Sequence, residues 1–284
     1  MEAATVRLRE LAQRVVDEAL ARGELRGALL AGSAGRGDAD QWSDVDLLLY
    51  VDELPPEGTL EAIRVAVGGA GPVTNERDEN YDGSDFFVGS VSVQAVYSRV
   101  SEVERRLERR LVDLQDLETP WQSGARGLLE GLVLHDDGVV ERLRERLRGF
   151  PEPLRRALIE LHWRELFPLW HYVDNLAARD SEPFRLEMLV DGMLRLLGVL
   201  AALNRVYYSR FHLKRVGDLV ASFAVAPADL KARLDALPGL PPREAADELG
   251  ALAAETRALV RTELRDLELP FRFPPGTRQE PLAP

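Results

Sequence analysis

The chain has 284 residues, of which 45% are hydrophobic and 30% are charged, so it is long enough to build two modest globular domains. It contains no cysteine and only four histidines, which excludes disulfides, thiolate metal sites and cysteine nucleophiles and argues against a zinc centre made of several histidines. The formal net charge is -12 and no basic stripe is visible, so nucleic acid is not an expected partner.

The sequence gives no sign of a membrane span or of export. Charged residues interrupt every apolar run before it reaches the roughly 18 residues that a membrane span needs. The N-terminal segment is amphipathic and carries several acids, and it lacks the basic start and apolar core of a secretion signal. We therefore expect a cytoplasmic protein with no membrane partner, while the oligomeric state stays open.

The first hundred residues alternate between helical and strand-like patterns. Helices are predicted where apolar residues recur at helical spacing, and strands where short β-rich runs lie between turn signals. In chain order the predicted elements are a helix at 2–22, a strand at 28–31, a glycine-rich turn opening a short helix at 32–37, a strand at 45–51, a helix at 57–67, a weak strand at 72–75 and a hairpin at 84–98 that turns at 88–90.

From residue 100 onward the sequence predicts only helices, at 100–117, 123–132, 139–148, 153–176, 183–208, 227–237 and 242–267. A strand-rich unit followed by a run of helices is typical of an α+β protein. We therefore predict a domain at 1–118 with a mixed sheet and flanking helices, an all-helical bundle at 119–270, and a cleft between them. The proline-rich tail at 271–284 is expected to be extended or disordered.

The most informative stretch is LLAGSAGRGDADQWSDVDLLLY, at residues 29–50. Gly32-Ser33 follows the first predicted strand, and ten residues later Asp44-Val45-Asp46 opens the second. Side chains two apart on a strand leave the same face, so the two carboxylates lie side by side. Neighbouring carboxylates repel each other unless a cation lies between them, and Mg²⁺ takes carboxylate and phosphate oxygens as ligands. The pair therefore predicts a divalent metal site.

The glycine-serine turn supplies groups that suit a triphosphate. Gly32 has no side chain and lets the backbone approach closely, and the Ser33 hydroxyl and the N–H groups at 32–35 can donate to phosphate. Arg36 can add a charge-assisted contact. Solvated aspartates are common at strand ends, so the pair alone would be weak evidence. The complete pattern, which ends in SDVDL from Ser43, favours a site for a nucleoside triphosphate and its metal ion.

The pattern G-S-x10-D-x-D resembles the nucleotidyltransferase superfamily that includes DNA polymerase β, in a style closest to bacterial aminoglycoside adenylyltransferases and minimal nucleotidyltransferases. The resemblance covers about the first hundred residues and implies a nucleotidyltransferase-type sheet there; the helical region is generally similar to the substrate-side bundle of such enzymes. It implies a Mg²⁺-dependent transfer of a nucleoside monophosphate to a hydroxyl, with ATP as co-substrate. By this resemblance Asp44 and Asp46 are catalytic metal ligands, while Gly32, Ser33 and Ser43 belong to the triphosphate site.

The chain departs from the family at one position. Members usually carry a third carboxylate on a later strand, in the form V-x-V-[DE], whereas the matching segment here is VSVQ, which ends at Gln94. A glutamine side chain forms hydrogen bonds, but it is not a base and it is a poor ligand for Mg²⁺. The family's third acid is therefore missing from its usual place.

Three explanations for Gln94 stay open, in this order. The base comes from the helical region, where Glu160 and Glu165 lie on a long predicted helix. Alternatively, Asp85 replaces it, because a two-residue turn at 89–90 would place Asp85 opposite Gln94 on the same face. Finally, the protein binds nucleotide without turning it over. A solvated surface acid explains each of these carboxylates at least as well as a catalytic role.

The helical region adds weaker candidates. Its aromatic residues recur at helical spacing among leucines, which favours core packing over a wall for an adenine base or an aglycone; they are Trp163, Phe167, Trp170 and Tyr172. Pro168 is expected to kink or divide this helix. Superfamily members often bring a basic residue from this region to the triphosphate, and Lys214 is the candidate because lysine is rare here. A surface basic cluster at 202–215 explains it equally well.

The leading hypothesis is a nucleotidyltransferase that acts on a small-molecule acceptor, with an aminoglycoside-like cation favoured by the acidic balance. One alternative is a toxin–antitoxin-type protein with a helical ribonuclease, because Arg156…His162 and Arg164…His171 fit a loose R-x(4–6)-H spacing. This spacing is common by chance, and both histidines are expected to be structural. The other alternative is a nucleotide-binding protein without turnover, because of Gln94.

Overall fold

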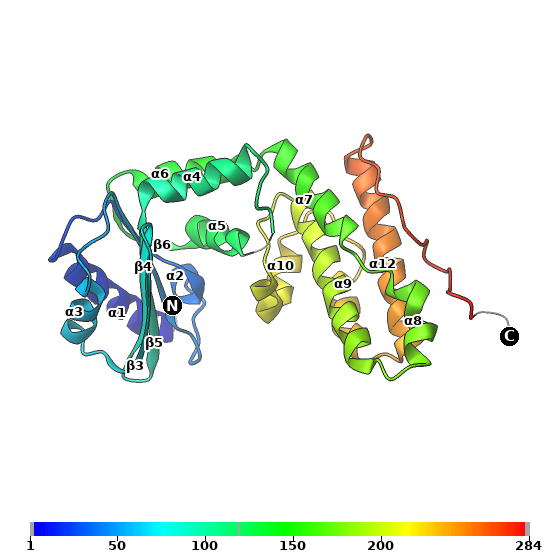
Figure 1. The fold of residues 1–284 in the computed structure, drawn as a ribbon, viewed down its shortest axis with the longest axis horizontal. Helices are drawn as coiled ribbons and strands as arrows, with labels where there is room; N and C mark the ends of the chain where they lie inside the picture. The colour runs from blue at the N-terminus through cyan, green and yellow to red at the C-terminus, as the bar shows by residue number, and fades with distance from the viewer. Residues whose placement is uncertain (1–2, 119, 282–284) are drawn as a thin grey trace. The chain divides into compact units, whose positions relative to one another are not determined.

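A computed structural model describes residues 3–118 and 120–281 of the chain. It divides into two compact units, each with its own interior. The first unit comprises Met1–Asp116 and Gly124–Phe150, and the second comprises Leu117–Ser123 and Pro151–Pro284. The first contains the sheet and the second contains helices, so the expected α+β class is confirmed (Figure 1).

The first unit is built on a six-stranded mixed sheet with the strand order β3-β4-β5-β2-β1-β6. β2 and β5 run parallel, and the other neighbouring pairs run antiparallel. The strands are β1 (Gly27–Leu30), β2 (Val45–Val51), β3 (Ala70–Arg77), β4 (Tyr81–Val88), β5 (Val91–Arg99) and β6 (Leu132–Asp136). The order places β2, which carries the aspartate pair, in the interior of the sheet.

One face of the sheet is covered by helices and the other is more open. α1 (Ala3–Leu20) and α3 (Thr59–Ala66) pack on one face, where alternate residues of β2, such as Leu47 and Leu49, are buried in the core of the unit (Figure 1). On the opposite face of β2, Asp46 and Leu48 are half-buried, whereas Tyr50 is buried. The alternation of the strand thus buries Leu47 and Leu49 and leaves the Asp46 carboxylate partly accessible.

Three further helices complete the sheet unit and its connection: α4 (Val100–Leu111), α5 (Trp121–Glu130) and α6 (Val139–Arg148). α4 and α6 lie side by side (Figure 1). Arg142 of α6 pairs with Glu104 of α4 at 3.0 Å, and Arg146 pairs with Glu108 one turn further along. These exposed pairs set the register of two amphipathic helices, and each contributes only about 0.2–1 kcal/mol to stability.

The boundary of the first unit differs from the expected one at residue 118. The sequence 132–136 was predicted as the end of a helix and a connection, but it forms β6 and pairs with β1 across a bulge. Residues 124–150 therefore fold with the sheet rather than with the helical region. Five residues are too few to show a period of two clearly, and the pairing partner lies about a hundred residues earlier in the chain, where local pattern cannot reveal it.

The second unit is helical. It contains α7 (Glu152–Arg164), α8 (Leu169–Ala177), α9 (Glu182–Leu203), η1 (Arg210–Arg215), α10 (Val216–Ala221), α11 (Leu230–Ala236), η2 (Leu237–Gly239) and α12 (Pro242–Glu263). Pro168 is the residue before α8 and divides the predicted long helix in two, as expected. Among the described residues, no helix combines the length and apolar character that crossing a membrane requires.

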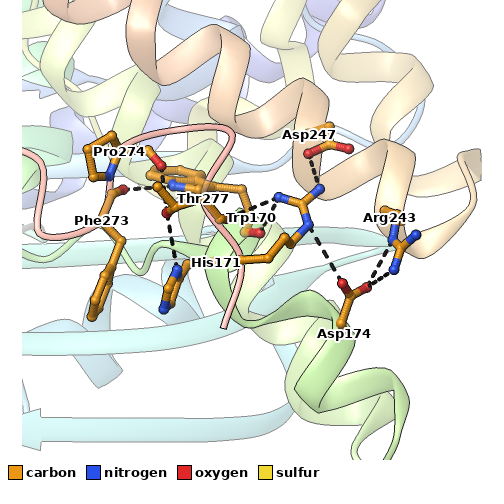
Figure 2. A network of polar contacts seen from close by, with 9 residues as sticks. Trp170, His171, Asp174, Arg243, Asp247, Phe273, Pro274 and Thr277 are labelled. Carbon is orange, nitrogen blue, oxygen red and sulfur yellow. Dashed lines mark hydrogen bonds and ion pairs between the residues drawn. The ribbon is translucent and has the colours of Figure 1, made fainter. Parts of the chain in front are cut away.

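The described part of the proline-rich tail, residues 271–281, forms no helix or strand, and it is packed against the helices of its own unit (Figure 2); residues 282–284 lie outside the described residues. The indole N–H groups of Trp163 and Trp170 donate to the backbone oxygens of Pro270 and Phe273, each at 2.9 Å. The rings of His171 and Phe273 stack at 3.9 Å. These contacts give both buried indoles an acceptor, so the tail is part of the folded unit.

An arginine near the end of the tail extends this network to two helices. Arg278 donates to the backbone oxygen of Trp170 at 2.6 Å and pairs with Asp247 of α12. Asp174 of α8 also receives Arg243 of α12 at 2.7 Å (Figure 2). The tail segment and the two helices are therefore joined by charges as well as by rings.

Candidate functional site

The predicted glycine-serine turn and the predicted metal-binding strand are in direct contact. Gly32 begins the short helix α2 (Gly32–Arg36) directly after β1, and its φ of 65° lies in the left-handed region. A Cβ atom at this position would lie 2.7 Å from Oδ2 of Asp46. The Ala31 N–H donates to the backbone oxygen of Asp46 at 2.8 Å. The left-handed backbone therefore favours glycine here, and a residue with a side chain would also have to displace the Asp46 carboxylate.

A second glycine in the turn is required for a different contact, which the sequence reading did not single out. A Cβ atom at Gly35 would lie 2.1 Å from the backbone oxygen of Leu30, at the end of β1. The helix can pack this closely on the strand only without a side chain. The spacing G-S-x-G in the sequence was the available signal, since both glycines face the strands on which the turn rests.

The loop between α2 and β2 is held by hydroxyl groups. The Ser33 hydroxyl donates to Oγ of Ser43 at 2.9 Å, and Ser43 donates in turn to Oδ1 of Asp40 at 3.0 Å. The same Asp40 oxygen accepts the N–H of Trp42 at 2.9 Å. Ser33 and Ser43, two of the predicted nucleotide-binding residues, are therefore brought together, and Asp40 is a third member that the motif did not indicate.

Gln94, which stands at the position of the third acid, lies beside Asp46 in the sheet. Asp46 on β2 pairs with Gln94 on β5, and Gln94 pairs with Asp85 on β4. β4 and β5 are joined by a two-residue turn, so the conditional prediction that Asp85 lies opposite Gln94 is confirmed. Because paired residues share a face, Asp46, Gln94 and Asp85 form one row across three neighbouring strands on the open side of the sheet.

The row separates the carboxylates instead of gathering them. Neighbouring strands are about 4.8 Å apart, so the backbones of Asp46 and Asp85 are about 10 Å apart, with Gln94 between them. Within residues 3–118 and 120–281, no three His, Asp or Glu side chains come together as a metal-binding group. Asp44, directly before β2, and Asp46 are thus two carboxylates that need phosphate oxygens and water to complete the shell of a hard divalent cation.

The remaining predicted site residues are exposed side chains with no hydrogen bond described to Gly32, Ser33 or Ser43. Arg36 at the end of α2 is exposed and faces Asp38 at 3.4 Å. Glu160 on α7, Glu165 directly after it and Lys214 in η1 are exposed residues of the helical unit. Lys214 lies over the ring of Phe211, with Nζ 5.8 Å from its centroid. The functional roles given to these side chains stay predictions.

The aromatic residues of the helical region are mostly core, as favoured from their spacing. Trp163 and Trp170 are 7% and 1% exposed. Phe167 and Tyr172 are half-buried, and their rings stack at 5.2 Å. These rings are occupied with one another and with the tail, which agrees with packing and not with a wall for a ligand.

Of the two histidines of the ribonuclease alternative, His162 is buried inside the helical unit and His171 is half-buried. His162 is 4% exposed, and burial, with a smaller effect of Arg195, lowers its pKa to about 4. His171 stacks on Phe273, and its Nδ1 lies 3.1 Å from the Thr277 hydroxyl. A neutral, enclosed imidazole cannot exchange protons with an RNA substrate, so His162 is structural, as expected.

The lowered pKa of His162 predicts a loss of stability in acid. The unfolded chain takes up a proton at this histidine below about pH 6.5, whereas the folded chain does so only near pH 4. Between these values the free energy of unfolding falls as the pH falls, by up to about 3 kcal/mol. We expect His162→Phe to remove this component. Denaturant unfolding of both proteins at several pH values measures the difference; equal pH dependence in the two proteins would contradict the assignment.

Comparison with known families agrees with the geometry. Residues 8–115 match the family model described as a nucleotidyltransferase domain. This segment contains the turn, β2 and the row that ends at Asp85. A comparison with curated protein sequences finds no match.

Among solved structures, the chain is similar to a nucleotidyltransferase-like protein from Exiguobacterium sibiricum, with 14% identity and a TM-score of 0.42. The match covers 90% of this chain and 77% of the other. This level of similarity adds nothing to the family match. The family match over residues 8–115, which include Gly32 and Asp46, shows that the first unit carries a nucleotidyltransferase domain.

Proposed function

We propose that the protein transfers a nucleoside monophosphate, AMP from ATP in the first instance, to a hydroxyl group of a small molecule. The observation that carries the proposal is the direct contact between the turn and the metal-binding strand, in which the Asp46 carboxylate fills the space beside Gly32. A triphosphate on the turn and a cation on the aspartates would then be neighbours. Such an arrangement supports phosphoryl-group chemistry, where positioning and charge neutralisation supply most of the catalysis.

Asp44 and Asp46 would hold Mg²⁺, which would supply charge neutralisation to the triphosphate. Two carboxylates on one face suit a cation that keeps several waters and shares phosphate oxygens. The hydroxyl of Ser33 and the backbone at the start of α2 would bind phosphate oxygens. On this view the hydrogen bond from Ser33 to Ser43 keeps the hydroxyl in place before the nucleotide arrives.

We place the general base at Asp85. Its carboxylate lies on the same face as Asp46 but two strands away, and it is exposed. A base for the acceptor hydroxyl need not be a metal ligand, but it has to face the space in which the acceptor binds, and Asp85 shares the face of Asp46. Gln94, between them, would donate a hydrogen bond to the acceptor or to a phosphate oxygen. Glu160 is the alternative base.

Replacing Asp85 by Asn is expected to lower kcat about 10²- to 10⁴-fold, because the loss of a general base has effects of this size. The dissociation constant for ATP is expected to change little, since Asp85 lies two strands from the aspartate pair. Initial rates of pyrophosphate release and a nucleotide-binding titration measure the two quantities. Glu160→Gln is the matched variant, and a loss of kcat in this variant alone would move the base to the helical unit.

The acceptor is proposed to be a small polyhydroxylated cation of the aminoglycoside type. The support is the net charge of -12, which favours cationic ligands. Pyrophosphate release with ATP and Mg²⁺ across a panel of cationic, neutral and anionic alcohols tests this choice. Turnover with neutral acceptors alone would overturn the cationic class. No turnover with any acceptor, combined with tight ATP binding, would favour the nucleotide-binding alternative, which the exposed Gln94 supports.

A further inference from the structure

The first helix is attached to the nucleotide-binding turn by an arginine that the motif does not include. Arg9 of α1 donates from Nε to the backbone oxygen of Ala34 at 2.9 Å and from Nη2 to that of Gly35 at 2.7 Å. Both oxygens belong to α2, whose last carbonyls have no partner within so short a helix. The guanidinium therefore fixes the backbone of the turn through two N–H donors whose relative geometry is rigid.

The same face of α1 holds the chain beyond the turn. Thr5, four residues before Arg9, is fully buried and accepts the N–H of Ala39 at 3.2 Å. Between these contacts, Gly37 has a φ of 95°, and a Cβ atom there would lie 3.2 Å from Nη2 of Arg9. α1 thus fixes both ends of the segment 34–39, which continues into the loop that carries Ser43.

We propose that Arg9 is a positioning residue for nucleotide binding: it fixes the backbone of the turn so that Gly32 and Ser33 meet the triphosphate without prior rearrangement. The proposal rests on the proposed function, because it assigns a role toward the same triphosphate. A turn that is already ordered loses less conformational entropy when the ligand binds, so the contact acts on affinity. Arg9 touches carbonyl groups of the protein and no reacting atom, so its effect on the chemical step is small.

The same helix provides a matched control. Arg14 of α1 donates from Nη2 to the backbone oxygen of Val67 at 2.7 Å, at the end of α3. It makes the same kind of arginine–carbonyl bond to the end of a helix but does not touch the turn. Arg14→Ala therefore removes one bond of this kind and Arg9→Ala removes two, and only Arg9→Ala is expected to loosen the segment 34–39.

The experiment compares Arg9→Ala, Arg9→Lys, Arg14→Ala and the unchanged protein in ATP titrations with Mg²⁺, in steady-state kinetics and in amide hydrogen exchange. We expect Arg9→Ala to raise the Kd and the KM for ATP about 10-fold with little change in kcat, a size typical of supporting contacts around a ligand site. Arg9→Lys, which can reach one carbonyl, should give an intermediate Kd. Exchange at Gly35, Gly37 and Asp38 should be faster in Arg9→Ala alone.

Two results would overturn the proposal: an unchanged Kd and unchanged local exchange in Arg9→Ala, or equal effects in Arg9→Ala and Arg14→Ala. Absence of ATP binding in the unchanged protein would refute the proposed function. The exchange data would still decide whether Arg9 orders the turn, because the Gly35, Gly37 and Asp38 N–H groups are hydrogen-bonded within the turn without nucleotide.

Discussion

Asp46→Asn is expected to abolish Mg²⁺-dependent nucleotide binding and to lower kcat/KM about 10³-fold or more. The carboxylate would be one of only two protein ligands to the cation, and loss of a metal ligand removes several kcal/mol of stabilisation from the charged transition state. Asparagine keeps the shape of the side chain and its fit beside Gly32, so the fold is retained. Titration with ATP in the presence and absence of Mg²⁺ separates the loss of metal binding from any loss of structure.

Asp52→Asn is the matched control for this variant. Asp52 follows β2 at its other end, is exposed, and pairs with Arg26 at 2.7 Å. Removing the same charge there alters the net charge of the protein equally but lies away from the turn. A similar loss of ATP binding in both variants would show that overall charge, and not the metal site, controls affinity.

The second large effect is expected at Gly32. Gly32→Ala forces a Cβ atom into the space of the Asp46 carboxylate, so the metal ligand has to move. The left-handed φ of 65° adds strain of about 1–3 kcal/mol for a residue with a side chain. We expect a loss of stability of this order together with a Kd for ATP at least about 10-fold higher, because a displaced carboxylate no longer fits the cation.

Gly89→Ala separates the two effects. Gly89, in the turn of the β4–β5 hairpin, has a φ of 62°, and a Cβ atom there would meet nothing within 4 Å. Gly89→Ala therefore imposes almost the same backbone strain as Gly32→Ala, but its new Cβ atom contacts no other group. Thermal unfolding and ATP titration of both variants give the comparison. If Gly89→Ala weakens ATP binding as much as Gly32→Ala does, the contact with Asp46 is not the cause.

The elements around the aspartate pair could be predicted from the sequence because their signals are local. β2 has its expected bounds at 45–51, since a short apolar run rich in leucine and valine follows Asp44 and ends before Pro55 and Pro56. The register that brings Asp85 opposite Gln94 follows from a two-residue turn, which leaves only one alignment of the two strands. The core of the proposed site could therefore be predicted from the sequence pattern of residues 32–94 alone.

Other features could not be predicted because their partners lie far away in the chain. Arg9 contacts Ala34 and Gly35, which lie 25 and 26 positions further along the chain. The sequence around an arginine on an amphipathic helix does not indicate which distant carbonyl group it will bind. β6 is a short run whose partner precedes it by about a hundred residues. Both of these missed contacts involve backbone oxygen, which every residue carries and no sequence motif distinguishes.

The packed tail has a consequence for the order in which the two units fold during synthesis. Trp163 and Trp170 leave the ribosome about a hundred residues before Pro270 and Phe273, whose backbone oxygens accept their indole N–H groups. Until then the two donors have no acceptor from this segment, so the helical unit can complete its interior only after residue 273 has been made. The sheet unit, which ends at residue 150, can fold long before that. A nascent chain stalled before residue 270 would therefore carry a finished first unit and an unfinished second one.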